Sequence, residues 1–128
     1  AIVAHGTESQ GLEILNTIFW NNITNHEWTP MTCSVGNPGT PVPLPGSGNV
    51  QWPTLRNGPA NNPDNPCTPG ILFADAMLGP LQDNGGPTPT LLPGENSMAI
   101  GLGSDCPETD QRGEPRSTDT CTAGAVEP

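Results

Sequence analysis

Apolar and polar residues alternate clearly in the segment GLEILNTIFWNN, residues 11–22. Four of its apolar side chains share one parity across a central asparagine, at Leu12, Ile14, Ile18 and Trp20. Such alternation predicts β-strands with one buried face. The first residues, AIVAHG, also have the composition of a strand.

Asn16 interrupts this pattern at its centre. Asparagine adopts the left-handed backbone conformation more readily than most residues, so it can bend a strand without a long loop. Two short strands joined at a one-residue corner are typical of right-handed parallel β-helices, in which coils stack about 4.8 Å apart. The alternative is one long strand of an antiparallel sandwich, with Asn16 on its solvent face.

Three further apolar segments, MTCSV, NVQW and GILFADAML, are separated by loops rich in proline and glycine. The loop GNPGTPVPLPGSG is incompatible with a helix or a central strand, because proline lacks the backbone donor. GILFADAML is compatible with a helical turn or with a strand that buries Leu72 and Phe73.

Residues 78–113 contain the dense turn signal QDNGGPTPT. Proline restricts the backbone, so this segment loses less entropy on ordering than a Gly/Ser linker would. Spaced apolar anchors favour an ordered cap over a linker: Leu91, Leu92, Met98, Ala99 and Ile100.

Composition and charge narrow the class of protein. Only 32% of the 128 residues are hydrophobic, and 16 glycines and 17 prolines predict a small core within much irregular backbone. The net charge of −10, without any lysine, argues against nucleic acid and anionic membrane surfaces as partners. No apolar run is long enough to be a transmembrane segment, and no signal peptide opens the chain. We therefore expect a processed part of a longer precursor.

The four cysteines, an even number in a small chain with few core residues, predict two disulfides. Three pairings are possible, and the local one, Cys33–Cys67 with Cys106–Cys121, is the simplest. It implies an oxidising compartment: extracellular, cell-surface or periplasmic. Four free thiols in a cytosolic protein are the alternative.

Three segments, GPLQDNGGPTPTLLPGENSMAI, DCPETDQRGEPR and CTAGAVE, resemble the C-terminal module of bacterial choice-of-anchor Q domain proteins. LEILNTIFWNN is similar to a late coil of the same proteins. The resemblance implies an all-β fold, a right-handed parallel β-helix of the pectin-lyase-like type, secreted or attached to the cell surface. It divides the chain into terminal coils, residues 1–77, and a C-terminal cap, residues 78–128. Two acids of the family pattern are replaced here, by Gly101 and Thr122.

Two arginines in the motif TDQRGEPR define a candidate site. Guanidinium forks bind carboxylates, so a sugar-acid site is one interpretation. We favour an internal structural clamp, because arginines in so acidic a chain have acidic neighbours with which to pair. The predicted clamp comprises Asp110, Arg112, Glu114 and Arg116.

Two further binding sites are hypotheses. A calcium ion is compatible with the acids that crowd the last two cysteines, although their spacing fits no known calcium loop: Asp105, Glu108, Asp110 and Asp119. Trp28 is a candidate sugar contact. No catalytic residues are predicted, since neither histidine has a nucleophile placed beside it in the sequence.

These observations predict a non-catalytic structural or interaction module, part of a larger surface protein or an accessory subunit. Its expected partners are other protein chains or earlier coils of its own precursor. The alternative is a β-helix that binds or degrades carbohydrate.

Overall fold

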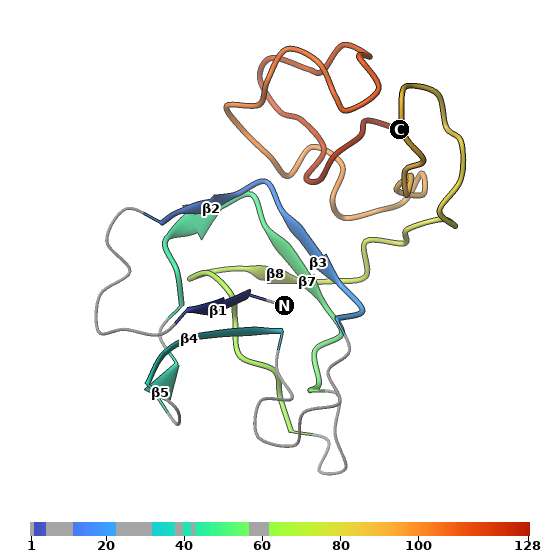
Figure 1. The fold of residues 1–128 in the computed structure, drawn as a ribbon. Coiled ribbons are helices and arrows are strands. Elements are labelled where there is room, and N and C mark those ends of the chain that lie inside the picture. Colours follow the sequence, from blue (N-terminus) through green and yellow to red (C-terminus); the bar gives the residue numbers. More distant parts are fainter. Residues whose placement is uncertain (1, 5–11, 23–31, 38–39, 42, 57–61) are drawn as a thin grey trace.

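The structure is a computed structural model that describes residues 2–4, 12–22, 32–37, 40–41, 43–56 and 62–128. The fold of these residues is all-β and contains no helix (Figure 1). Its strands are β1 (Ile2–Ala4), β2 (Ile14–Leu15), β3 (Ile18–Trp20), β4 (Cys33–Asn37), β5 (Thr40–Pro41), β6 (Gly46–Ser47), β7 (Val50–Trp52) and β8 (Leu72–Phe73). The strands predicted at the first residues and within residues 11–22 are therefore confirmed. Of the two alternatives for GILFADAML, the structure has the strand, at Leu72 and Phe73.

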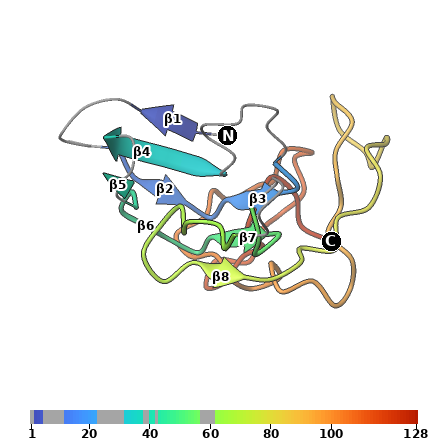
Figure 2. The ribbon, with the colours of Figure 1, turned by 90° about the horizontal axis from the view of Figure 1, so that it is seen from below.

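The strands pair in parallel at a repeating interval. β1 pairs with β4, β2 with β6 and β3 with β7, so that the chain returns beside itself after roughly 32 residues. β8 extends the third sheet by pairing in parallel with β7, while β5 forms a short antiparallel pair with β4. Figure 2 shows β1, β2 and β3 on one side of their partners, where they are the edge strands of the three sheets.

A corner of two residues separates β2 from β3 and β6 from β7, and in each corner the first residue has a positive φ. Asn16 lies between β2 and β3 with a φ of 49°, and Gly48 lies between β6 and β7 with a φ of 65°. A Cβ atom on Gly48 would collide with Oδ1 of Asn16, so the two corners stack closely. The bend predicted at Asn16 is confirmed, and the antiparallel alternative is wrong because the pairing is parallel.

One hydrophobic core lies between the sheets. It is formed by Ile14, Phe19, Cys33, Leu44 and Cys67. Phe19 is 5% exposed, whereas the sequence parity placed Ile18 and Trp20 on the buried face. The corner at Asn16 explains the difference, since it redirects the strand and thereby exchanges the faces that β3 presents.

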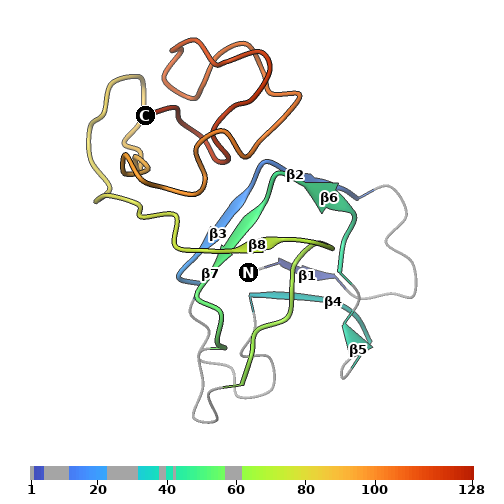
Figure 3. The same cartoon turned by 180° about the vertical axis from the view of Figure 1, so that it is seen from behind.

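A second core covers the other face of β3, β7 and β8. Ile18, Val50 and Leu72 are paired across this sheet and face the C-terminal segment. There they contact three fully buried small residues, Ala76, Ala99 and Ala123. Figures 1 and 3 show the C-terminal segment beside this sheet. The C-terminal segment is thus joined to this sheet by apolar contacts.

Residues 78–128, called the C-terminal module below, contain no strand and are connected by isolated bridges. A hairpin is formed by the bridges Leu78–Pro93 and Gln82–Thr90. Ala99 is buried as expected, but Leu91, Met98 and Ile100 are exposed, which corrects three of the predicted anchors. The module is ordered largely through polar contacts, as described below.

Both predicted disulfides are present. The Cα atoms are 5.2 Å apart in Cys33–Cys67 and 6.3 Å apart in Cys106–Cys121. The pair of disulfides indicates a non-reducing environment outside the cytosol. Within the described part of the chain, no helix is long and apolar enough to cross a membrane.

Candidate functional site

Asp110 is the centre of a polar network in the C-terminal module, and its side chain is 0% exposed. Its Oδ2 accepts hydrogen bonds from Nε and Nη2 of Arg112, at 3.0 and 2.8 Å, and from the backbone amide of Glu127 at 3.0 Å. Its Oδ1 accepts from the backbone amides of Arg112 and Glu114. The loop TDQRGE folds around this carboxylate because two of its backbone amides, its one guanidinium and the backbone amide of Glu127 converge on it.

These contacts determine the ionisation of Asp110. Burial by itself acts to raise the pKa of the carboxyl group. The hydrogen bonds from Glu127, Arg112 and Glu114 outweigh burial and hold the pKa at about 2, below the ordinary value of 3.8. Asp110 is therefore fully ionised at neutral pH, and it is unsuited to act as a general acid or base at that pH.

The low pKa of Asp110 predicts acid sensitivity. A carboxyl group whose pKa is lower in the folded than in the unfolded chain stabilises the fold above its unfolded pKa. This contribution, about 2 kcal/mol, is expected to be lost as the pH falls from about 4 to about 2. Urea denaturation across this window measures it. The matched variant Asp110→Asn should have a flatter pH profile, and an equally steep profile would contradict this assignment.

Arg112 connects three segments of the module. Besides its ion pair with Asp110, its Nη1 donates to the carbonyl oxygen of Asn84 at 3.2 Å, and its Nη2 donates to the carbonyl oxygen of Glu127. The hairpin approaches the backbone of Arg112 closely at Gly86, where a Cβ atom would lie 2.7 Å from Cα of Arg112. The guanidinium is thus occupied by protein groups.

Two adjacent glycines of the hairpin provide a matched test of this approach. Gly86 and Gly85 have φ of 82° and 92°, so alanine incurs a similar backbone strain of about 1–2 kcal/mol at either position. Only at Gly86 does the added methyl group also meet Arg112, since nothing lies within 4 Å at Gly85. Gly86→Ala should therefore lower the free energy of unfolding by about 1 kcal/mol more than Gly85→Ala. Equal losses in urea titrations would show that the hairpin does not dock there.

Arg116 is held by a second set of contacts, and its side chain is 5% exposed. Its Nη1 contacts Oε1 of Glu127 at 3.0 Å and the carbonyl oxygen of Thr122 at 2.9 Å, while its Nη2 donates to the carbonyl oxygen of Gly124. Thr122 in turn donates from its amide and its hydroxyl to the Glu127 carboxylate.

The predicted clamp is thus arranged differently from the expectation. Asp110 and Arg112 form the expected pair, but Glu114 contributes its backbone amide and carbonyl, and the carboxylate beside Arg116 belongs to Glu127. Glu127 is not among the residues of the predicted clamp. Its position in the motif CTAGAVE was the available signal, but nothing local indicated that the C-terminus folds back onto residues 110–116.

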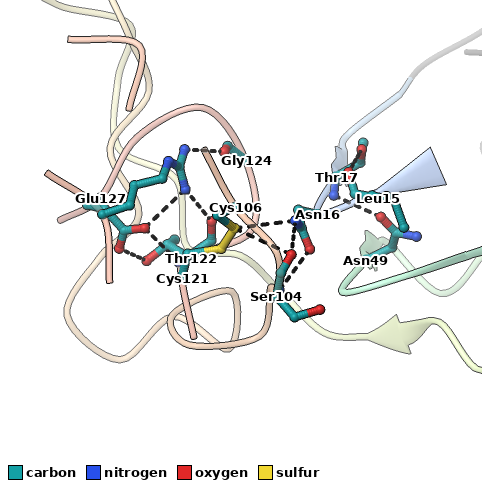
Figure 4. The surroundings of a disulfide bond; sticks show 11 residues. Leu15, Asn16, Thr17, Asn49, Ser104, Cys106, Cys121, Thr122, Gly124 and Glu127 are labelled. Atoms are coloured by element: carbon teal, nitrogen blue, oxygen red, sulfur yellow. Dashed lines mark hydrogen bonds and ion pairs between the residues drawn. A yellow bond between two sulfur atoms is a disulfide. The ribbon is translucent and has the colours of Figure 1, made fainter. Parts of the chain in front are cut away.

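Asn16 joins the corner between β2 and β3 to the C-terminal module (Figure 4). Its Nδ2 donates to the carbonyl oxygen of Ser104 at 2.7 Å and lies 3.3 Å from Sγ of Cys106, and its Oδ1 accepts from the Ser104 amide. Its backbone carbonyl accepts from the amide of Gly124 at 2.7 Å. The sequence pattern identified Asn16 as a bend and missed this second role, because its partners lie some 90 residues away.

A buried polar network also supports the first core. Gln51, 0% exposed, donates to Oδ2 of Asp64 and accepts from the amide of Cys67. Asp64 also accepts from the amide of Thr32. These bonds position both sides of the Cys33–Cys67 disulfide, and the sequence offered no signal for them.

The structure does not bring the four candidate calcium ligands together. Asp105, Glu108 and Asp119 are exposed, and both Asp110 oxygens already accept hydrogen bonds from the protein. Across the described residues, no group of three or more His, Cys, Asp or Glu is placed to hold a metal ion. The calcium hypothesis therefore lacks support from this geometry.

The tryptophans do not form an exposed platform in the described part of the chain. Trp20 packs against the second core, and its Nε1 donates to Oδ1 of Asp75 at 3.0 Å. Trp52, half-buried, is paired with it in the sheet. Trp28, the candidate sugar contact, lies outside the described residues.

Comparison of the chain with protein-family models, with curated proteins and with solved structures finds no match.

Proposed function

We propose that the chain is the terminal part of a right-handed parallel β-helix and acts as a non-catalytic structural module of a larger extracytoplasmic protein. The observation that carries this proposal is the parallel pairing of three strands with three others at nearly the same interval, roughly 32 residues. Parallel strands joined by crossovers of this length are right-handed in nearly all proteins. The stacked corners at Asn16 and Gly48 further support a coil that repeats.

The resemblance to choice-of-anchor Q domain proteins agrees with this proposal. The segments that carry the resemblance are those that hold the C-terminal module together. Asp110 and Arg112 form its central ion pair, and Glu127 closes the second one with Arg116. A role in such a surface protein would place the chain outside the cytoplasm, in agreement with its two disulfides.

The commitment of charged groups to internal contacts supports a non-catalytic role. Arg112 and Arg116, the arginines that a sugar-acid site would require, are bonded to carboxylates and backbone carbonyls. The carbohydrate alternative requires an accessible lateral face, and the outer face of β3, β7 and β8 is covered by the C-terminal module. Packing therefore favours the structural role.

An activity screen tests the non-catalytic assignment. The purified chain should produce no new reducing ends or unsaturated products from polygalacturonate or from a panel of neutral and acidic polysaccharides. Arg112→Ala provides a matched preparation in which a carboxylate-binding fork is removed. Turnover by the unmodified chain that a single exposed carboxylate substitution abolishes, such as Asp119→Asn, would overturn the proposal.

A further inference from the structure

Strand β3 is an edge strand of the sheet that it forms with β7 and β8. The amide of Val50 donates to the carbonyl of Thr17, and the amide of Asn21 donates to the carbonyl of Trp52, so these residues of the β3 segment face β7. In a parallel ladder the intervening residues, Ile18 and Trp20, direct their N–H and C=O groups to the opposite side. No strand of the described residues pairs with β3 on that side.

An apolar groove of about 540 Å³ lies beside this edge. Asn16, Thr17 and Ile18 form one wall. The opposite wall comes from the C-terminal module, chiefly through side chains of the hairpin: Leu78, Leu81, Pro89 and Leu91. Leu81 is 68% exposed and Leu91 is 38% exposed, so the wall presents uncovered apolar surface.

The hairpin at residues 78–93 is held by polar contacts in addition to the packing of Leu78 against the second core. Its bridge Gln82–Thr90 is reinforced by Asn84, whose Nδ2 donates to the carbonyl and hydroxyl oxygens of Thr90. Gln111 donates to the hydroxyl of Thr88, and Arg112 donates to the carbonyl of Asn84. Figure 2 shows this segment, in yellow-brown, extending past β3 on the side away from β7. These contacts hold the walls of the groove apart, so that the groove lies open next to the unpaired edge of β3.

We propose that this groove holds the apolar side chain of a further strand that pairs in parallel with the open edge of β3, within an additional coil located earlier in the same polypeptide. The hairpin packs against the outer face of that coil, as the rest of the C-terminal module packs against Ile18 and Val50. The inference rests on the proposed function, and it adds a contact that the proposed function does not require.

The arrangement of the edges identifies the occupant. β1, β2 and β3 are all edge strands on the same side, so a complete partner offers three strands at once, each running parallel to its neighbour. An additional coil that precedes the first one by the same interval of roughly 32 residues offers three such parallel strands. A second copy related by a twofold axis would instead bring β3 against itself in antiparallel orientation. Continuity with the pairing already present therefore favours a coil of the same chain.

The register also defines the chemistry of the strand. The row that contains Ile18, Val50 and Leu72 is aliphatic throughout, and the neighbouring row pairs Trp20 with Trp52. The additional strand accordingly carries an aliphatic residue level with Ile18 and an apolar residue two positions later. The aliphatic side chain enters the groove between Ile18 and Leu81.

A duplicated coil tests this inference. A second copy of residues 1–32, joined ahead of residue 1, supplies a coil at the repeat interval of the described strands. We expect hydrogen exchange at the amides of Ile18 and Trp20 to slow by at least about tenfold. We also expect Tm to rise by about 4 °C or more. Leu81→Asp should remove at least half of this rise in the extended chain, yet shift Tm little in the unextended chain, where Leu81 is exposed. Leu55→Asp, at an exposed leucine outside the groove, is the matched control.

The outcomes separate the inference from the proposed function. If the amides become protected but Leu81→Asp and Leu55→Asp behave alike, the hairpin does not contact the coil and the inference fails, while the proposed β-helix stands. If the copy neither protects the amides nor raises Tm, both fail. If the unextended chain already protects these amides and sediments as a dimer, a second copy occupies the edge and the inference is overturned.

Discussion

Asp110→Ala is expected to lower the free energy of unfolding by about 3–5 kcal/mol, a loss typical of breaking a buried ion pair. The substitution leaves the guanidinium of Arg112, 13% exposed, without its carboxylate. It also removes the acceptor for the backbone amides of Glu114 and Glu127. Because marginally stable domains have about 5–15 kcal/mol in total, the C-terminal module should be severely weakened. Thermal and urea denaturation at neutral pH measure the loss.

Asp119→Ala is the matched control for this prediction. Asp119 lies in the same module and carries the same charge, but it is exposed. Its substitution should change stability by less than about 0.5 kcal/mol. A loss below about 1 kcal/mol for Asp110→Ala would show that the network around Asp110 does not hold the module together.

Removal of the Cys33–Cys67 disulfide should have an effect of comparable size. The two cysteines are separated by 34 residues, and the chain-entropy relation assigns about 4 kcal/mol to closing a loop of that length. Both sulfur atoms also belong to residues of the first core, with Cys67 only 1% exposed. The double variant Cys33→Ala with Cys67→Ala should therefore unfold at a much lower urea concentration than the unmodified chain.

The second disulfide provides the comparison. Cys106 and Cys121 are separated by 15 residues, which corresponds to about 3 kcal/mol. We expect the double alanine variant at this pair to lose less stability than the variant at Cys33 and Cys67. The reverse order would mean that Asp64 and Gln51 hold the first loop in place without the covalent link.

The two disulfides and the polar network stabilise different parts of this chain. The first core is covalently closed and contains the bulky side chains Phe19 and Leu44. The contact between the sheet and the C-terminal module instead uses small side chains, Ala76, Ala99 and Ala123. Small residues permit close approach but bury little apolar area each, so hydrogen bonds and ion pairs have a larger share in holding the module.

Several features follow from the sequence because they depend on neighbouring residues. The strand segments around Asn16, the bend at that residue and the irregular but ordered course of residues 78–113 belong to this class. Their causes are local: side-chain alternation, the tolerance of asparagine for positive φ, and the fixed φ of proline. The disulfide pairing was also predictable, since the pairs are the local ones.

Other features were decided by contacts between residues distant in the sequence. The parity rule placed Ile18 on the inner face, but the corner at Asn16 exchanges the faces, so that Phe19 points into the first core. The outer face carrying Ile18 is then buried by Ala123, which no local pattern indicates. Likewise, Glu127 rather than Glu114 pairs with Arg116 because the C-terminus folds back over the loop. Side-chain alternation specifies that a strand has two faces, and only the tertiary fold determines what covers each of them.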